Sequence, residues 1–395
     1  MTYASITDRL AGLGSGKWEV HFAGRRRKAA GHDVIEMTIG EPDIPPDPAL
    51  LDICAEAMRA GRTRYSNGQG EEALLNAIAA KYSRRTGRTI TTDQVLCFPG
   101  TQTALYTVMA GLVEGGDAVL IPDPYYATYE GVVRATGATV VPVPTWDRHR
   151  FHLQAADLEA AITPATKVLL LNTPHNPTGA VLSADEIAGI GAVCRKHDLW
   201  IVADEVYEDL ILRGSFASPF DRADLAERTV VCSSISKSHA APGFRSGWAV
   251  GPVAFCEKLL PVSEIMLFGG QPFIADMTAH ALTHDIPTAA TMRAAYARRA
   301  ALVCTALAGT ALKPLSPEAG MFLLIDVRAA GLTGDAFAKG LLDAENVATM
   351  PGASFGAQAE GFIRLSLTVP DGKLAEACAR IARFAASHGI REVAE

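Results

Sequence analysis

Short apolar runs alternate with helix-like segments between about residue 50 and residue 284. Apolar side chains recur every three or four positions in LLDICAEAMRA (50–60) and SADEIAGIGAVCRKHD (183–198), the spacing of one helix face. Between such segments lie short runs rich in Val, Ile and Leu, which are typical of buried strands: QVLCF, AVLIP, TVVPV, KVLLLN, WIVADEV, TVVCSSIS and GWAVG. The alternation predicts an α/β fold with a mostly parallel seven-stranded sheet between helices.

The pattern changes after this block. A helical stretch containing YARRAALVCTAL begins near Pro287, and MFLLIDV, another helix, FIRLSL and a terminal helix follow it. With 395 residues, the chain exceeds the size at which one hydrophobic core stops growing. We therefore expect a large domain at 48–285 and a smaller α+β domain made of 1–47 and 286–395.

Composition excludes several classes of protein. The net charge of -7 and the lack of a basic run longer than RRRK (25–28) argue against a nucleic-acid partner. Seven scattered cysteines without a CxxC pair favour a reducing compartment and give no metal site. The sequence shows neither a signal peptide nor an apolar run long enough to span a membrane. We expect a cytoplasmic protein with no membrane partner.

The first candidate site is SSISKSHAAPGFRSGW (233–248), which directly follows a predicted strand. Ligands of open parallel sheets bind at the carboxyl ends of the strands. Lys237 has the amine that forms a Schiff base with an aldehyde. Donors for a phosphate dianion come from Ser234, Ser236 and Arg245. The segment fits a phosphorylated aldehyde; a polar loop with solvated Lys and Arg side chains is the alternative.

Two further strand ends carry polar side chains. WIVADEVY brings Asp204 to the end of an apolar run, with Tyr207 just beyond it. Such a carboxylate is often a turn or helix cap, but it could also keep a pyridine nitrogen protonated. LNTPHNPTGA leaves its strand with prolines, which mark a tight turn, and with Asn176. In a functional interpretation, Asn176 and Tyr207 bind a phenolic oxygen of the same ring.

Three more positions complete the candidate site. FPGTQTALY is a strand, a glycine turn and a helix start, so the backbone N–H groups of Gly100, Thr101 and Gln102 predict an anion site. In IPDPYYATY, Tyr126 could stack on a flat ring or simply belong to the core. FIRLSL places Arg364 in an apolar strand. A buried arginine needs a partner, and its planar fork suits a carboxylate.

In these segments the sequence resembles the class I/II aminotransferases of pyridoxal-phosphate fold type I. The motifs stand in the family's order along nearly the whole chain: IGEPD, RYSNGQG, GTQTAL, PDPYYATY, NTPHNPTG, ADEVY, SISKSHAAPGFRSGW and IRLS. The resemblance implies pyridoxal 5'-phosphate as cofactor and a homodimer in which Tyr65 reaches the partner's phosphate. It also assigns Lys237 to the cofactor aldehyde, Asp204 to the ring nitrogen, and the substrate to Gly40, Asn176 and Arg364.

The implied activity is transfer of an amino group from an α-amino acid to an α-keto acid in a ping-pong cycle. Alternatives are other reactions of the same fold type (β-lyase, decarboxylase or oxidase) and a non-catalytic, cofactor-sensing regulator. The regulator lacks support, because the segment before residue 50 shows neither a helix-turn-helix pattern nor a basic face. The glycine-rich GLGSG (12–16) follows no strand, which excludes a nicotinamide site.

The donor is less clearly indicated. GKWEVH, SPF and IMLFGGQPFIAD are similar to arginine:pyruvate transaminases as well as to aspartate-like ones. Aspartate-preferring prokaryotic relatives carry a lysine where this chain has Gln102, and an amide offsets the desolvation of a second carboxylate less well. We expect neutral or basic donors and a pyruvate-like acceptor, unless Arg25 or Arg293 reaches the pocket.

Overall fold

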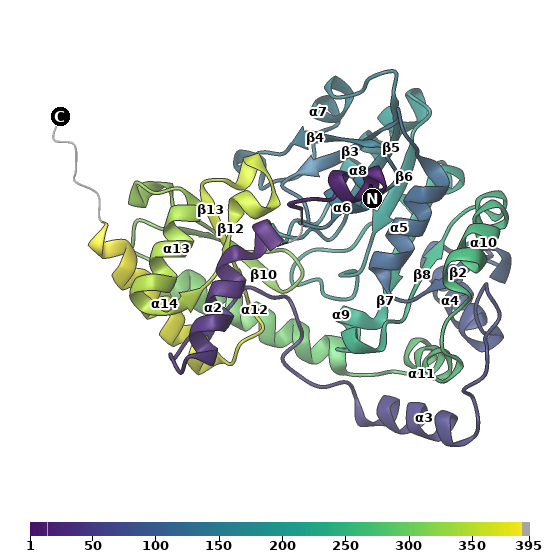
Figure 1. Cartoon of the computed structure of the whole chain (residues 1–395), viewed down its shortest axis with the longest axis horizontal. Helices are drawn as coiled ribbons and strands as arrows, with labels where there is room; N and C mark the ends of the chain where they lie inside the picture. The colour runs from purple at the N-terminus through teal and green to yellow at the C-terminus, as the bar shows by residue number, and fades with distance from the viewer. Residues whose placement is uncertain (14, 389–395) are drawn as a thin grey trace.

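The computed structural model describes residues 1–13 and 15–388, and a seven-stranded sheet forms the centre of its larger part (Figure 1). The strand order is β2-β8-β7-β6-β5-β3-β4, with β8 antiparallel to both of its neighbours and the pairs from β7 to β4 parallel. Each strand coincides with a predicted apolar run, so the predicted fold class is confirmed. The strands are β2 (Val95–Phe98), β3 (Ala118–Asp123), β4 (Thr139–Pro144), β5 (Thr166–Asn172), β6 (Trp200–Asp204), β7 (Thr229–Ser234) and β8 (Gly247–Val250).

Both faces of this sheet are apolar because helices cover both. Along β6, Val202 packs with one layer of helices, whereas Ile201 and Ala203 pack with the other. The layer on the Val202 face contains α5 (Thr101–Leu112), α6 (Tyr129–Ala135) and α10 (Val253–Leu267). The opposite layer contains α3 (Pro48–Arg59), α4 (Glu72–Thr86), α7 (Ala155–Ala160), α8 (Ala184–Lys196) and α11 (Pro272–Thr283).

The smaller part is built around an antiparallel sheet in the order β12-β13-β10-β9. A short parallel pair, β1 with β11, ties the N-terminal segment to this part. The strands are β1 (Ile35–Glu36), β9 (Lys313–Leu315), β10 (Phe322–Asp326), β11 (Val347–Ala348), β12 (Met350–Pro351) and β13 (Phe362–Ser366); the helices are α2 (Glu19–Ala29), α12 (Thr288–Ala306), α13 (Gly334–Glu345) and α14 (Asp371–Ser387).

The first helix lies elsewhere than expected. Helix α1 (Ser5–Arg9) contacts α6 of the larger part, and Arg9 Nε donates to the carbonyl of Arg134 at 2.9 Å. Helix α1 thus packs on a helix that covers the large sheet, whereas α2 and β1 of the same segment pack with the smaller part. The assignment of 1–47 to the small domain stays a prediction. Residues 389–395, also assigned to the small domain, lie outside the described residues. Within the described chain, none of the helices combines the length and apolar character needed to cross a bilayer.

Candidate active site

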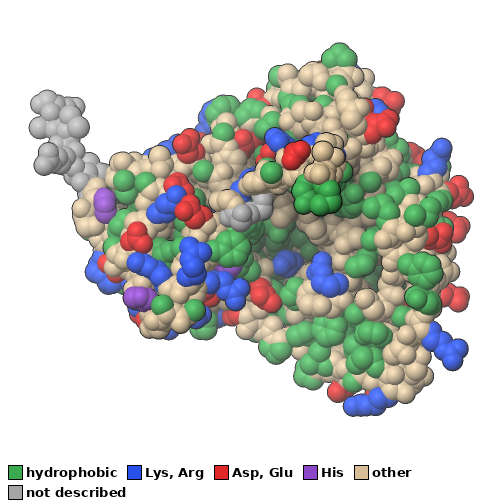
Figure 2. Space-filling model, viewed as in Figure 1, with side chains coloured by type: hydrophobic (Ala, Val, Ile, Leu, Met, Phe, Trp, Pro, Cys, Tyr) green, Lys and Arg blue, Asp and Glu red, His purple; other side chains and the backbone are tan. Residues whose placement is uncertain are grey.

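A cavity of about 450 Å³ lies where the carboxyl ends of β5, β6 and β7 face β10 and β13 of the smaller part. Figure 2 shows a hollow between the two parts, with basic side chains in it and at its edge. The cavity brings together residues that are up to 346 positions apart, from Trp18 to Arg364. The predicted site residues that line it are Gly40, Thr101, Gln102, Tyr126, Asn176, Asp204, Tyr207, Ser234, Ser236, Lys237, Arg245 and Arg364.

Lys237 lies in the short helix α9 (Ile235–Ser238), directly after β7. Its Nζ donates to the carbonyl of Gly40 at 2.6 Å. Burial lowers the pKa of this amine to about 8. A lysine that loses its proton this readily is a nucleophile near neutral pH, so the position suits covalent attachment of an aldehyde.

Asp204 ends β6 and is buried. Its Oδ2 accepts from the hydroxyl of Tyr129 at 2.6 Å, and its Oδ1 accepts from the backbone N–H of Val206 at 3.2 Å. Burial raises the pKa of the Asp204 carboxyl to about 6. Among the described residues no cation forms an ion pair with this carboxylate. The group is therefore available to a cationic ligand atom in the cavity.

Arg364, in β13, is 1% exposed and has no carboxylate partner in the described part of the chain. Its Nη1 donates to Asn176 Oδ1 at 3.0 Å and its Nη2 to the carbonyl of Thr38 at 2.5 Å, while Nε has no partner. The guanidinium lies 3.9 Å from the ring centre of Phe322. Burial lowers its pKa to about 10. A buried guanidinium without a countercharge is costly, so the structure favours an anionic ligand here.

The opposite end of the cavity gathers donors for an anion. Arg245 follows the loop after α9, and within the described part of the chain its Nη1 and Nη2 donate only to backbone carbonyls, at 2.8 and 3.4 Å. The hydroxyl of Thr101 is buried without a partner, and Thr101 and Gln102 open helix α5, whose first N–H groups have no helical acceptor. An orphaned hydroxyl, a helix start and a guanidinium together fit a phosphate.

The prediction that Gly100 offers a free N–H to this anion site was wrong. The N–H of Gly100 is not free, because it donates to the carbonyl of Phe98 at 2.7 Å. Gly100 has φ +85°, and a Cβ at this position would lie 2.1 Å from Nη2 of Arg245. A glycine is needed here because a side chain would displace the guanidinium. Gly100 thus shapes the anion site without lining it.

Aromatic and amide groups form the remaining walls. Tyr126 lies edge-on to Tyr129, with ring centres 5.6 Å apart. Tyr207 is buried, and burial raises the pKa of its hydroxyl above the usual range. The backbone N–H of Asn176 donates to Asn172 Oδ1 at 2.8 Å, which holds the loop after β5 in place. The Oδ1 of Asn176 accepts from Arg364, and the Asn176 side chain also lies within hydrogen-bonding reach of the Tyr207 hydroxyl.

Sequence reasoning missed some lining residues, and one expected residue lies apart. Tyr65 does not line the cavity; it is 88% exposed and packs edge-on against Phe268. Tyr129 could have been noticed as the last tyrosine of PDPYYATY, whereas Trp18 and Glu41 had no strand-end signal. The lining residues that were not predicted are Trp18, Ile39, Glu41, Leu105, Tyr129, Asn172, Val206, Pro242, Gly243 and Phe322.

Comparison with known proteins shows to which family the chain belongs. The model of the aminotransferase class I and II family matches residues 32–381. The chain belongs to this family. It is 40% identical over 387 residues, 98% of both chains, to an arginine–pyruvate transaminase of Pseudomonas aeruginosa. It is 32% identical to an aspartate aminotransferase of Geobacillus stearothermophilus, covering 90% of this chain and 92% of that one.

Solved structures agree with this assignment. An aspartate aminotransferase from Thermus thermophilus with maleate superposes with a TM-score of 0.91 at 29% identity, covering 97% of this chain and 100% of the other. This aminotransferase therefore moves an amino group from an amino acid to a keto acid and depends on pyridoxal phosphate. The cavity fits that cofactor, because it offers an anion site with an orphaned hydroxyl, an amine and an unpaired carboxylate.

Proposed function

We propose that this aminotransferase takes neutral or basic amino acids as donors and a pyruvate-like keto acid as acceptor. The observation that carries the proposal is the charge of the cavity: among the described residues, its lining cations are Lys237, Arg245 and Arg364. Each of these cations would serve the cofactor or the α-carboxylate that every amino acid carries. None remains for a carboxylate in the donor's side chain.

The residues that would hold the cofactor follow from the geometry above. Pyridoxal phosphate, when bound, supplies a ring that draws electrons from the donor's Cα. Asp204 would keep the ring nitrogen protonated, and Lys237 would hold the aldehyde and then move the proton at the donor's Cα. The phosphate would lie against Thr101, Gln102, Ser234, Ser236 and Arg245, and the ring against Tyr126, Asn176 and Tyr207.

Arg364 would fix the donor by its α-carboxylate. The guanidinium has the planar fork that binds a carboxylate bidentately, and its orphaned Nε shows that its donors are not all used within the protein. Holding the α-carboxylate orients the Cα–H bond toward the amine of Lys237, and Gly40 closes the site on that side. Positioning of this kind is worth several orders of magnitude in rate.

The donor side chain would meet neutral and acidic groups. Gln102 lines the cavity, and its Oε1 accepts from the Thr128 hydroxyl at 3.0 Å. The two arginines that could have supplied a cation do not line it: Arg293 donates to the carbonyl of Asp209 at 2.7 Å, and Arg25 lies on α2. The similarity to the Pseudomonas arginine–pyruvate transaminase supports the same donor class.

Turnover with four donors tests the proposal. Values of kcat/KM for alanine, phenylalanine, arginine and aspartate are measured with one common acceptor. We expect aspartate to be the poorest or near the poorest of the four. A lead of aspartate by tenfold, equal to about 1.4 kcal/mol of transition-state stabilisation, would contradict the proposal.

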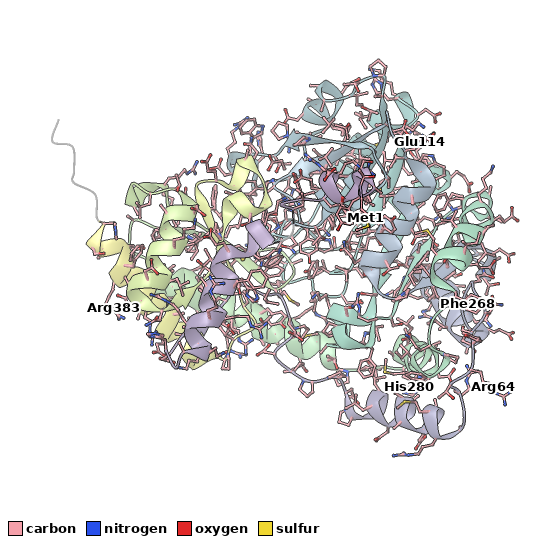
Figure 3. The ribbon with its side chains drawn as sticks, viewed as in Figure 1. Met1, Arg64, Glu114, Phe268, His280 and Arg383 are labelled. Carbon is pink, nitrogen blue, oxygen red and sulfur yellow. The ribbon has the colours of Figure 1, made fainter. Side chains whose placement is uncertain are left out.

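We also propose that the enzyme is a homodimer with Tyr65 serving the partner's phosphate site. Tyr65 and Phe268, which pack against each other, are 88% and 64% exposed, and Ile265 near the same end of α10 is 85% exposed. Figure 3 places Arg64 and Phe268 at the edge of the large part, far from Arg383 of the small part. Apolar groups gathered in this way favour a protein contact.

Mixed dimers test the shared site. Tyr65→Phe protein mixed with Lys237→Ala protein should form hybrids in which one site has both native groups, so activity should exceed that of either parent. Sedimentation should give a dimer at working concentration, and a monomer would contradict the arrangement.

Cytoplasmic location is a further proposal, supported by seven cysteines that are free in the structure. We also keep the domain boundary near residues 285–286 as a proposal, since α12 packs with the small sheet's core.

A further inference from the structure

One wall of the cavity comes from the N-terminal segment and is not needed to hold the cofactor. Trp18 ends a short helical turn, and its ring packs against Ala127, Met350 and Phe355. The Phe355 ring lies 4.4 Å from the guanidinium of Arg364. The indole is therefore anchored close to the place where the donor's α-carboxylate would bind. Ile39 and Glu41 line the same cavity from the segment after β1.

Glu41 is the charged lining residue without a use in the cofactor site. It has no ion-pair or hydrogen-bond partner among the described residues. It adjoins Gly40, whose carbonyl accepts from Lys237. Burial lowers the pKa of the Lys237 amine, and the charge of Glu41 opposes that lowering, which shows that the two groups lie near each other. Glu41 is exposed at the cavity wall and its charge acts on Lys237, so it lies beside the region into which a donor would extend.

We infer that Trp18, Ile39 and Glu41 form the subsite for the donor side chain, and that this subsite selects a long side chain ending in a guanidinium. The flat cation can stack on the indole face and bind the Glu41 carboxylate through two N–H groups. Its aliphatic stem can pack on Ile39, which is 39% exposed. An aspartate side chain would instead bring its carboxylate beside Glu41. The inference rests on the proposed function and names the residues that carry it out.

The test compares arginine with alanine in the holoenzyme. Glu41→Gln keeps the shape of the side chain and removes its charge, and Glu257→Gln is the matched control on the exposed face of α10. We expect Glu41→Gln to lower the ratio of kcat/KM for arginine to that for alanine by about tenfold, mainly through KM, as loss of a charge-assisted hydrogen bond does. The control should leave the ratio unchanged.

A second variant and a binding measurement keep the inference independent of catalysis. Trp18→Leu should lower the same ratio, and Trp18→Phe should restore part of it, because an aromatic face returns. Calorimetry with 5-guanidinopentanoate, which lacks the reacting amine, should show weaker binding to Glu41→Gln, whereas binding of pentanoate should change less. Thermal unfolding confirms that each variant is folded.

The outcomes separate the two proposals. If Glu41→Gln lowers arginine and alanine turnover equally, the carboxylate acts on Lys237 and the subsite is overturned. An unchanged ratio in both the Glu41 and Trp18 variants overturns it as well. If instead the native enzyme prefers aspartate, the proposed function fails before the subsite is examined.

Discussion

Two arginines near the end of β6, Arg85 half-buried and Arg364 buried, differ in how their charge is met. Arg85 of α4 donates to Glu205 at 2.8 Å, to Glu208 at 2.6 Å and to Asp221 at 2.8 Å. Arg364 reaches one amide oxygen and one backbone carbonyl and has no carboxylate among the described residues. The charge of the first arginine is met by three carboxylates, although its Nη2 has no partner among the described residues, and the charge of the second is met by none.

The pKa values express the same difference. Although burial works against it, the carboxylates of Glu205 and Glu208 hold the pKa of Arg85 above its usual range. Burial without a countercharge lowers the pKa of Arg364 to about 10. Asp204 and Glu205 are adjacent in sequence yet serve different regions, because neighbouring residues at a strand end point to opposite sides. Paired charge marks the structural cluster here, and unpaired charge marks the ligand site.

The largest expected effect is on Lys237, the amine of the unpaired region. Lys237→Ala should lower transamination on the order of 10⁴-fold or more, because covalent attachment and proton transfer are lost together. The native protein should be yellow, and borohydride should fix the cofactor on Lys237, as peptide mass mapping would show. Lys167→Ala, at an exposed position, is the control. An adduct on another lysine would sink the assignment.

Next in size is the effect of Arg364→Met. Losing the partner of the donor's carboxylate should lower kcat/KM by about 10²–10³-fold, the equivalent of about 3–4 kcal/mol. The melting temperature should stay the same or rise, because a buried charge without a countercharge is removed. Steady-state kinetics and calorimetry measure the two effects. A marked loss of stability with little loss of activity would show that Arg364 is the structural arginine and not the one that binds the donor.

Arg85→Met should show the opposite pattern. Removing Arg85 leaves Glu205 and Asp221 without an ion pair in the described part of the chain, while Lys81 still pairs with Glu208 at 3.0 Å. Breaking such a largely buried group typically costs about 3–5 kcal/mol of stability. Activity per folded molecule should fall far less than in Arg364→Met. Urea unfolding and single-temperature kinetics on the same samples decide this. Equal loss of activity in the two variants would show that the Arg85 cluster also positions the site.

Strand identity and strand-end chemistry could be predicted from the sequence because both are local. Apolar runs end at Asn172, Asp204 and Ser234, and the loops beyond them carry the reactive groups. Contacts between distant segments could not be predicted in this way. Tyr129 meets Asp204 only because α6 covers the Val202 face of the sheet. Trp18 lines the cavity only because the N-terminal segment packs against residues of both parts.

The pairing of charged residues could not be predicted from the sequence either. Arg85 lies in a run of basic residues near the end of α4, a pattern that is typical of a solvated helix end. It is only 16% exposed, because Glu205, Glu208 and Asp221, which come from elements far along the chain, pair with it. Gly100 shows a similar limit: a glycine turn suggests a free N–H, but the local turn uses that N–H and the missing side chain makes room for Arg245.

The smallest expected effect is a pH dependence that belongs to Asp204. Burial raises its pKa from 3.8 to about 6 in the folded protein without cofactor, so the folded state binds its proton more tightly than the unfolded chain does. The resulting stabilisation is present below pH 4 and is lost as the pH rises through about 6. Asp204→Asn has no such loss. Relative to native protein, the cofactor-free variant should therefore gain about 2–3 kcal/mol between pH 4 and pH 7.

Urea unfolding of both cofactor-free proteins across this range measures the difference, with Glu257→Gln as the control for an exposed acid. With cofactor bound, the gain should shrink or change sign, because a cationic ring nitrogen favours the charged carboxylate. Parallel stability curves in the cofactor-free proteins would mean that Asp204 is compensated within the protein, as Glu208 is by Arg85, and would remove it from the unpaired region.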